Sequence, residues 1–180
     1  MEKKSLLRGN RIILRELQED DWLGIHDYAS QEQASRFQPW GPNTEEETKI
    51  FVQEALDEAK KNPRNRFFFV IQGIQNNELL GAVELNISDF HNQAGDIGYI
   101  INPKNWGEGF ATEAAQLVLR YGFEVLKLHR IYATCSPENA GSARVLEKVG
   151  MTKEGTMRDH LKMKDGWRDS SLYSILENEI

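Results

Sequence analysis

The sequence WGEGFATEA, residues 106–114, decides the fold because it places a glycine-rich turn between an expected strand and an expected helix. Gly107, Gly109 and the small Ala111 let backbone N–H groups turn inward without collisions from Cβ atoms. The N-terminus of the following helix adds unpaired N–H donors and a partial positive charge. Such a turn can hold a pyrophosphate, although an ordinary tight turn explains the two glycines equally well.

Two rival nucleotide motifs are tested by the same residues. The dinucleotide fingerprint G-x-G-x-x-G needs a third small residue at position 112, where this chain has Thr112. A Walker A loop needs Gly-Lys followed by Ser or Thr, and residues 106–114 contain no such sequence. The sequence therefore disfavours both NAD binding and NTP hydrolysis.

The sequence before the turn predicts mainly strands. Residues 10–17, 64–71, 79–87 and 94–101 are rich in β-branched and aromatic residues, and a turn at Asn76-Asn77 separates two of them. Two helices are expected between the first two strands. One extends to Tyr28 and is capped by Asp20 or Asp21, and the other starts at Thr44, where Thr44-Glu45-Glu46-Glu47 matches a capping box.

The sequence after the turn predicts a helix, a strand, a short helix and two more strands. The first helix runs from Thr112 to about Leu126, and Gly150 ends the second. Strands are expected at 130–135, 152–158 and 169–177. One face of the first helix is expected to be apolar, with these residues: Ala114, Leu117, Val118, Tyr121 and Val125. This order predicts an α/β (α+β) fold with a right-handed strand–helix–strand crossover and a mixed, mostly antiparallel sheet, flanked by helices on both faces.

Composition excludes several functional classes. The chain has 180 residues, 22 Lys+Arg and 28 Asp+Glu, which gives a net charge of −6 and argues against non-specific nucleic-acid binding. A single cysteine, Cys135, excludes an intramolecular disulfide, and we expect it to be a small buried residue. Lys3 and Lys4 are followed by no apolar leader segment, so we expect a cytoplasmic, soluble, single-domain protein (1–180) without a membrane span. The four histidines (His26, His91, His129 and His160) lack metal-binding spacing.

The turn and its surroundings resemble one family over nearly the whole chain. Lys104-Asn105-Trp106-Gly107-Glu108-Gly109 is similar to the Q/R-x-x-G-x-G/A acyl-CoA motif of the GNAT N-acetyltransferases, with Lys104 in place of Gln or Arg. Four other segments resemble the branch of ribosomal-protein N-terminal acetyltransferases (RimJ/RimL type). They are Arg11–Arg15, Asp96–Tyr99, Asn139–Met151, and Gly166-Trp167-x-Asp169 with Tyr173.

The resemblance implies acetyl-CoA as the cofactor and assigns the residues that hold it. Backbone groups at Ile100, Ile101 and Asn102 would pair with the pantetheine amides, as an added strand does. Asn139 would contact the CoA arm, although an Asn-Ala-Gly sequence equally suits the start of a helix. The diphosphate would bind to the loop residues Trp106, Gly107, Glu108, Gly109, Phe110, Ala111 and Thr112. The resemblance is also compatible with a homodimer, but the sequence does not determine the oligomeric state.

Acetyl transfer needs a neutral amine and a stabilised leaving thiolate. Glu84 and Asp96 are the candidate general bases, and each could instead be a solvated strand residue. Ser142 is the candidate acid at the thiolate through the resemblance, and it could alternatively cap the helix. Trp40 could line the acceptor site or fill the core.

The pKa of the amine favours one class of acceptor. An α-amine has a pKa of about 8 and a lysine side chain about 10.4, so an N-terminal amine demands less of the base. The expected acceptor is therefore a protein or peptide N-terminus. Two alternatives stay open: a small amine, such as a polyamine, amino acid or antibiotic, and a CoA-binding module without turnover.

Overall fold

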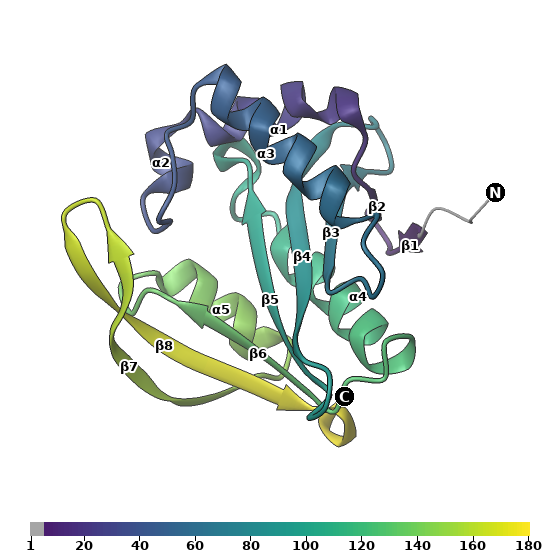
Figure 1. Cartoon of the computed structure of the whole chain (residues 1–180), viewed down its shortest axis with the longest axis vertical. Coiled ribbons are helices and arrows are strands. Elements are labelled where there is room, and N and C mark those ends of the chain that lie inside the picture. Colours follow the sequence, from purple (N-terminus) through teal and green to yellow (C-terminus); the bar gives the residue numbers. More distant parts are fainter. Residues whose placement is uncertain (1–5) are drawn as a thin grey trace.

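The computed structural model describes residues 6–180, so Lys3 and Lys4 lie outside the described part of the chain. The described residues form an eight-stranded sheet in the order β1-β2-β3-β4-β5-β6-β8-β7, antiparallel except between β5 and β6 (Figure 1). The strands are β1 (Leu6–Arg8), β2 (Ile12–Glu16), β3 (Arg66–Gly73), β4 (Leu79–Asp89), β5 (Ala94–Ile101), β6 (Arg130–Cys135), β7 (Thr152–Met163) and β8 (Gly166–Leu176).

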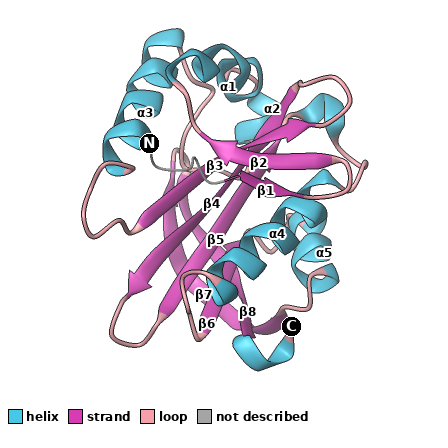
Figure 2. Ribbon diagram, turned by 90° about the vertical axis from the view of Figure 1, so that its right-hand side faces the viewer, coloured by secondary structure: helices cyan, strands magenta, loops and turns pink. Residues whose placement is uncertain are grey.

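Helices cover both faces of this sheet (Figure 2). They are α1 (Trp22–Ala29), α2 (Glu32–Ser35), α3 (Glu45–Glu58), α4 (Phe110–Glu124) and α5 (Ala140–Lys148). Helices α4 and α5 pack against the larger core, which contains Phe69, Leu85 and Ile131. Helices α1 and α3 enclose a second core around Ile25 and Phe68. The expected architecture is therefore confirmed.

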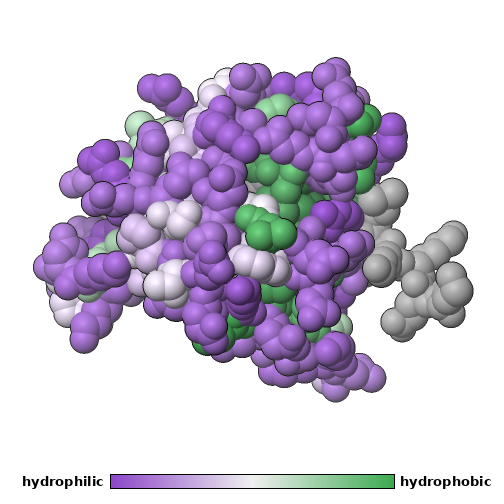
Figure 3. Space-filling model, turned by 90° about the horizontal axis from the view of Figure 1, so that it is seen from above, coloured by the Kyte–Doolittle hydropathy of each residue, from purple (hydrophilic) through white to green (hydrophobic). Residues whose placement is uncertain are grey.

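Most apolar side chains lie in these two cores. Seen from above, the molecule has a mainly hydrophilic surface, and hydrophobic residues gather in one area near the middle of this face (Figure 3). No described helix has the length and apolar character that a membrane crossing requires. Burial of apolar surface on both faces of one sheet thus accounts for the fold.

Several local expectations are confirmed. The strands Ala94–Ile101 and Arg130–Cys135 have the expected bounds. Thr44 caps α3 through the Glu47 N–H at 3.2 Å, and the Glu47 carboxylate accepts from the Thr44 N–H at 2.7 Å. Gly150 follows the end of α5 with a φ of +89°, a conformation that glycine adopts without strain.

Two expectations about helices are wrong. Helix α4 begins at Phe110 and ends at Glu124, and Val125 is its C-cap. Val125 is 59% exposed, so it does not belong to the buried apolar face of the helix. The carboxylate of Asp21 does not cap α1. It pairs with Arg15 through two contacts of 2.7 Å, because the adjacent strand offers a guanidinium that binds both carboxylate oxygens.

The C-terminal strands are longer than expected. They continue past the predicted ends at Arg158 and Asp169 and form a hairpin that turns at Lys164-Asp165. Exposed and half-buried residues of mixed polarity form this extension, and the register shifts between Met157 and Leu161. Neither feature leaves the alternating pattern by which a strand is recognised. The short elements β1 and α2 were likewise not predicted.

Candidate active site

The sheet opens where β5 and β6 part. These parallel strands pair only between Ala94–Asp96 and Arg130–Tyr132, and Figure 1 shows them diverging beyond this point. A cavity of about 630 Å³ lies between the separated ends and extends under the 37–43 loop. Its size is typical of a small-molecule site. The divergence therefore gives the sheet both an unpaired strand edge and a space beside it.

Glu84 lies on one wall of this cavity. Its neighbours Val83 and Leu85 are buried in the larger core, and strand alternation directs Glu84 to the opposite face, as expected. Arg66, on β3, contacts its carboxylate at 2.9 Å. Gly98 lies opposite Glu84 on β5, and because it has no side chain it leaves the space beside the carboxylate open.

Asp96 lies in the part of β5 that is still paired with β6. Its carboxylate accepts from the Asn86 side chain at 3.1 Å, and it is not among the residues that line the cavity. Burial raises the pKa of Asp96 against the opposing effect of the Asn86 hydrogen bond, and the charge of Glu84 raises it further. The two candidate bases therefore occupy different environments, and only Glu84 borders the cavity.

Ser142 lies on the other wall, in the first turn of α5. Asn139 is the N-cap of this helix, and its side chain accepts from the Ser142 N–H at 3.0 Å. The Ser142 hydroxyl is consequently not needed as a cap. It lies 2.9 Å from the Tyr99 hydroxyl, and its interaction with the Cys135 thiol acts to lower the pKa of that thiol. Both Asn139 and Ser142 line the cavity.

Tyr99 reaches from β5 to α5 across the opening. Its hydroxyl donates to the Ser142 carbonyl at 3.1 Å in addition to contacting the Ser142 hydroxyl. Burial raises the pKa of Tyr99 above its ordinary value and also raises that of the Cys135 thiol. Cys135 is buried, as expected, but it also lines the cavity. Three neutral polar groups thus line the same cavity as Glu84.

The unpaired edge of β5 exposes the backbone groups of alternate residues. The Asn102 N–H donates to the Leu80 carbonyl on the β4 side, so it is not free for the expected pantetheine contact. Since backbone groups alternate in direction along an antiparallel strand, Ile100 shares this orientation, whereas Tyr99 and Ile101 face the open edge. The Ile101 carbonyl accepts from the Trp106 indole N–H at 2.7 Å, which anchors the following loop.

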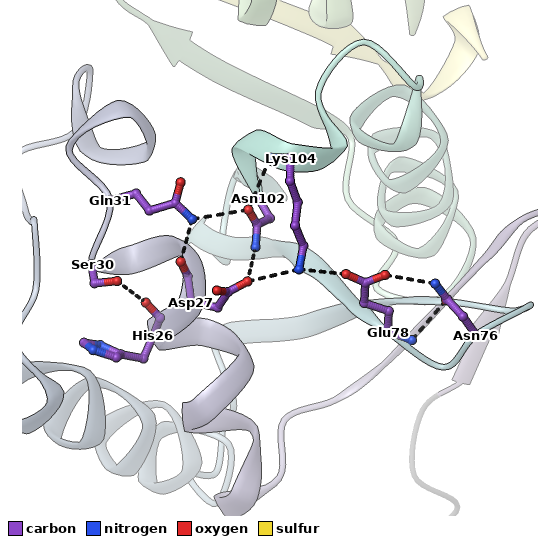
Figure 4. A network of polar contacts seen from close by, with 8 residues as sticks. All are labelled: His26, Asp27, Ser30, Gln31, Asn76, Glu78, Asn102 and Lys104. Carbon is purple, nitrogen blue, oxygen red and sulfur yellow. Dashed lines mark hydrogen bonds and ion pairs between the residues drawn. The ribbon is translucent and has the colours of Figure 1, made fainter.

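Asn102 and Lys104 belong to a polar network that holds this strand end against α1 (Figure 4). Asn102 is fully buried, and its side-chain NH₂ donates to Asp27 at 2.6 Å. The Lys104 ammonium contacts Asp27 at 3.2 Å and Glu78 at 2.8 Å. The hydrogen bond from Lys104 is the largest cause of a lowered pKa at Asp27. Lys104, the residue that departs from the acyl-CoA motif, therefore has a structural role here.

The glycine-rich loop leaves the start of α4 open. Gly107 and Gly109 have φ values of +81° and +82°, in the left-handed region that glycine tolerates. A Cβ atom placed at Gly107 would find no atom within 4 Å. Gly109 is the N-cap and has no side chain with which to cap the helix. The N–H groups that begin α4 are therefore suited to an anion such as a diphosphate.

A salt bridge ties this loop to β2. Glu113 accepts from the backbone N–H groups of Asn10 and Arg11 at 2.7 and 2.9 Å, and from the Arg11 side chain at 3.2 Å. Burial opposes ionisation of Glu113, but these hydrogen bonds outweigh it and lower the pKa. Arg11 also donates to the Glu108 carbonyl at 2.8 Å and lies over the Phe110 ring. The contacts of Arg11 therefore fix the conformation of the glycine-rich loop.

Other expectations concern residues around the cavity. Trp40 lines it and also packs against the second core, so both interpretations of this residue describe its position. Within residues 6–180, no cluster of His, Cys, Asp or Glu has the arrangement of a metal site.

Sequence reasoning missed three contributors to the site. Arg66 pairs with Glu84 across two strands, and the β3–β4 register would have indicated this pairing. Tyr99 belonged to a segment that was recognised as a strand and as part of the family resemblance, but it was given no role of its own. Arg168, on the late hairpin, lines the cavity and donates to the Phe37 carbonyl, 131 residues earlier in the chain. No local pattern signals that contact.

The comparisons with known proteins agree with this geometry. The Acetyltransferase (GNAT) domain family matches residues 11–152. The chain belongs to this family of acetyl-CoA-dependent N-acetyltransferases. It is 36% identical over 170 residues to "Uncharacterized N-acetyltransferase YnaD" of Bacillus subtilis, covering 94% of this chain and 95% of that protein. It is 25% identical over 173 residues to a spermidine N(1)-acetyltransferase of Vibrio cholerae, covering 94% and 95%.

Solved structures show the same fold. An acetyltransferase of the GNAT family from Bacillus anthracis has a TM-score of 0.85 and 36% identity, over 97% of this chain and all of that one. The ribosomal-protein-S5-alanine acetyltransferase from Vibrio fischeri has a TM-score of 0.81 and 26% identity, over 97% of this chain and 98% of that one.

Proposed function

We propose that this N-acetyltransferase acts on the N-terminal α-amine of a protein or peptide. The observation that carries the proposal is the cavity at the strand opening, which Glu84, Tyr99 and Ser142 all line. A base on one wall and hydroxyl groups on the other match the two proton movements that amine acetylation requires.

The cofactor would bind along the unpaired edge and the glycine loop. Acetyl-CoA supplies an acetyl thioester when bound. The open-edge N–H groups of Tyr99 and Ile101 are suited to the pantetheine amides, as in strand addition. The N–H groups of the Gly107–Thr112 loop are suited to the diphosphate. This arrangement directs the thiol end toward Ser142 and the cavity.

The side chains then have complementary roles. Glu84 accepts a proton from the acceptor ammonium, directly or through water, and the ion pair with Arg66 fixes the carboxylate. Ser142, held by Tyr99, donates a hydrogen bond to the developing thiolate charge. Asp96 is the weaker candidate base because it does not line the cavity.

Charge favours a peptide over a polyamine. A site for a polyamine needs unpaired carboxylates for its several ammonium groups. Of the two acidic residues that line this cavity, Glu84 is paired with Arg66, and Glu47 caps α3 through Thr44. The likeness to a spermidine acetyltransferase keeps a small amine as the competing acceptor class.

Thiol release from acetyl-CoA tests the proposal. The purified enzyme is assayed with peptides that have free N-termini, with the same peptides N-terminally blocked, with spermidine and with single amino acids. We expect release with free peptides and none with blocked ones. Fast turnover of spermidine with none of any peptide would replace the proposal with the competing class.

A further inference from the structure

The β7–β8 hairpin directs a guanidinium group to the cavity. Arg168, on β8, lines it together with its cross-strand neighbour Leu161. One terminal nitrogen of Arg168 donates to the Phe37 carbonyl, and the other donates to the Ser170 hydroxyl at 3.0 Å. Figure 1 shows this hairpin on the same side of the molecule as α2. The bond to Phe37 places the guanidinium where the hairpin meets the 37–43 loop.

Arg168 has more donors than partners. A guanidinium carries five N–H groups, whereas the structure gives Arg168 hydrogen bonds only to Phe37 and Ser170. Its Nε is buried and has no hydrogen-bond partner within residues 6–180. Burial also lowers the pKa of this group, which is nonetheless charged at neutral pH. A partly desolvated guanidinium with spare donors is suited to a carboxylate.

The charge balance of the cavity supports an anionic ligand. Its lining contains three cationic residues and two acidic ones, and one cation, Arg66, is already paired with Glu84. Within the described residues, neither Arg168 nor Lys164 forms an ion pair. Lys164 donates to the Gly41 carbonyl, on the same loop that Arg168 contacts. The hairpin side of the cavity is therefore positive.

Arg168 also lies close to the candidate reaction centre. Its charge acts to lower the pKa of Cys135, although burial raises that pKa overall. Cys135, Ser142 and Arg168 all line the same cavity. A carboxylate bound to Arg168 would thus lie near the position at which the amine of the same molecule meets the thioester.

We infer that the acceptor carries a carboxylate near its amine and that Arg168 binds this carboxylate as a specificity-determining residue. The inference rests on the proposed function and narrows it. Two sources share this chemistry: an acidic side chain close to a peptide N-terminus, and the α-carboxylate of a free amino acid. Polyamines lack the group.

Pairs of acceptors that differ only in one carboxylate distinguish the two sources of this group. Peptides with Glu or Gln at the second or third position differ only in the carboxylate, and alanine and alaninamide form the corresponding pair for a free amino acid. For one of these pairs we expect the kcat/KM of the wild-type enzyme to favour the carboxylate by about tenfold or more, the effect of a hydrogen bond to a charged group. A preference for the Glu peptides would identify an acidic side chain near a peptide N-terminus as the source of the carboxylate. A preference for alanine over alaninamide would identify the α-carboxylate of a free amino acid.

Variants of Arg168 test whether this residue binds the carboxylate of the acceptor. In Arg168→Gln the preference within the favoured pair should fall to about twofold or less, and Arg168→Lys should restore part of it. The preference is the informative quantity, because loosening of the contact with Phe37 would slow both members of a pair alike. Lys162→Gln removes a charge from the same hairpin outside the cavity and should keep the full preference.

The outcomes distinguish this inference from the proposed function. Equal rates within every pair, with measurable peptide turnover, overturn the role of Arg168 and leave the peptide proposal standing. A preference that persists in Arg168→Gln also overturns it. Turnover of spermidine alone overturns both.

Discussion

The Tyr99 hydroxyl lies 2.9 Å from the Ser142 hydroxyl and 3.1 Å from the Ser142 carbonyl, and it joins β5 to α5 across the opening of the sheet. The contact links β5, the strand proposed to bind the cofactor, with α5, the helix that carries the candidate acid. The position of the Ser142 hydroxyl therefore depends on a residue of β5.

Ser142→Ala should lower kcat about 100-fold, the usual effect of removing one donor to developing charge, and change acetyl-CoA affinity much less. Tyr99→Phe should lower kcat about tenfold, because Ser142 remains but is no longer held. Steady-state kinetics and calorimetry with CoA separate the two quantities. An unchanged kcat in Ser142→Ala would remove this residue from the mechanism.

Glu84 and Asp96 can be separated by neutral isosteres. Glu84→Gln should lower kcat/KM about 100-fold, as expected for loss of a general base, whereas Asp96→Asn should stay within about threefold. Thermal unfolding of both variants controls for the charge left on Arg66. The opposite pattern would identify Asp96 as the base.

The sequence predicted the parts of this site that depend on local chemistry. The glycine turn, the strand Ala94–Ile101 and the capping box at Thr44 each arise from residues close together in the chain. Alternation along β4 was enough to place Glu84 on the face opposite Val83 and Leu85. These features need only backbone sterics and periodicity.

The remaining parts depend on register between distant strands. The separation of β5 from β6 after Asp96 has no signature in either strand. The bond from Arg168 to Phe37 joins segments 131 residues apart, and that from Arg11 to Glu113 spans 102. Such contacts follow from the assembled sheet, so one sequence without its fold does not reveal them.

Gly107 offers a test of the diphosphate loop. Gly107→Ala should lower the free energy of unfolding by about 1–2 kcal/mol, because its φ of +81° strains a residue with a Cβ. Gly107→Asn should cost less, since asparagine tolerates this conformation. Chemical denaturation measures both.

The same two variants should weaken CoA binding about tenfold in calorimetry, because a side chain would occupy the open space beside the loop. Unchanged CoA affinity in both would show that the cofactor does not approach Gly107.

Glu154 should contribute stability at neutral pH that the protein loses in acid. The Arg130 guanidinium, followed by the Ser174 hydroxyl, lowers the pKa of Glu154 from 4.5 to about 2. A lowered carboxylate pKa contributes stability that is fully present above pH 4.5 and is lost as the pH falls toward 2. The Glu154 side chain is 39% exposed, so solvent screening limits the effect to less than about 1 kcal/mol.

Denaturation of wild type and Glu154→Gln at pH 7, 4 and 2.5 should show a difference in the free energy of unfolding that shrinks as the pH falls. Glu138→Gln, at an exposed residue without an ion pair in the described chain, should show no such trend. A difference between wild type and Glu154→Gln that is constant over this range would mean that the pair with Arg130 does not stabilise the fold.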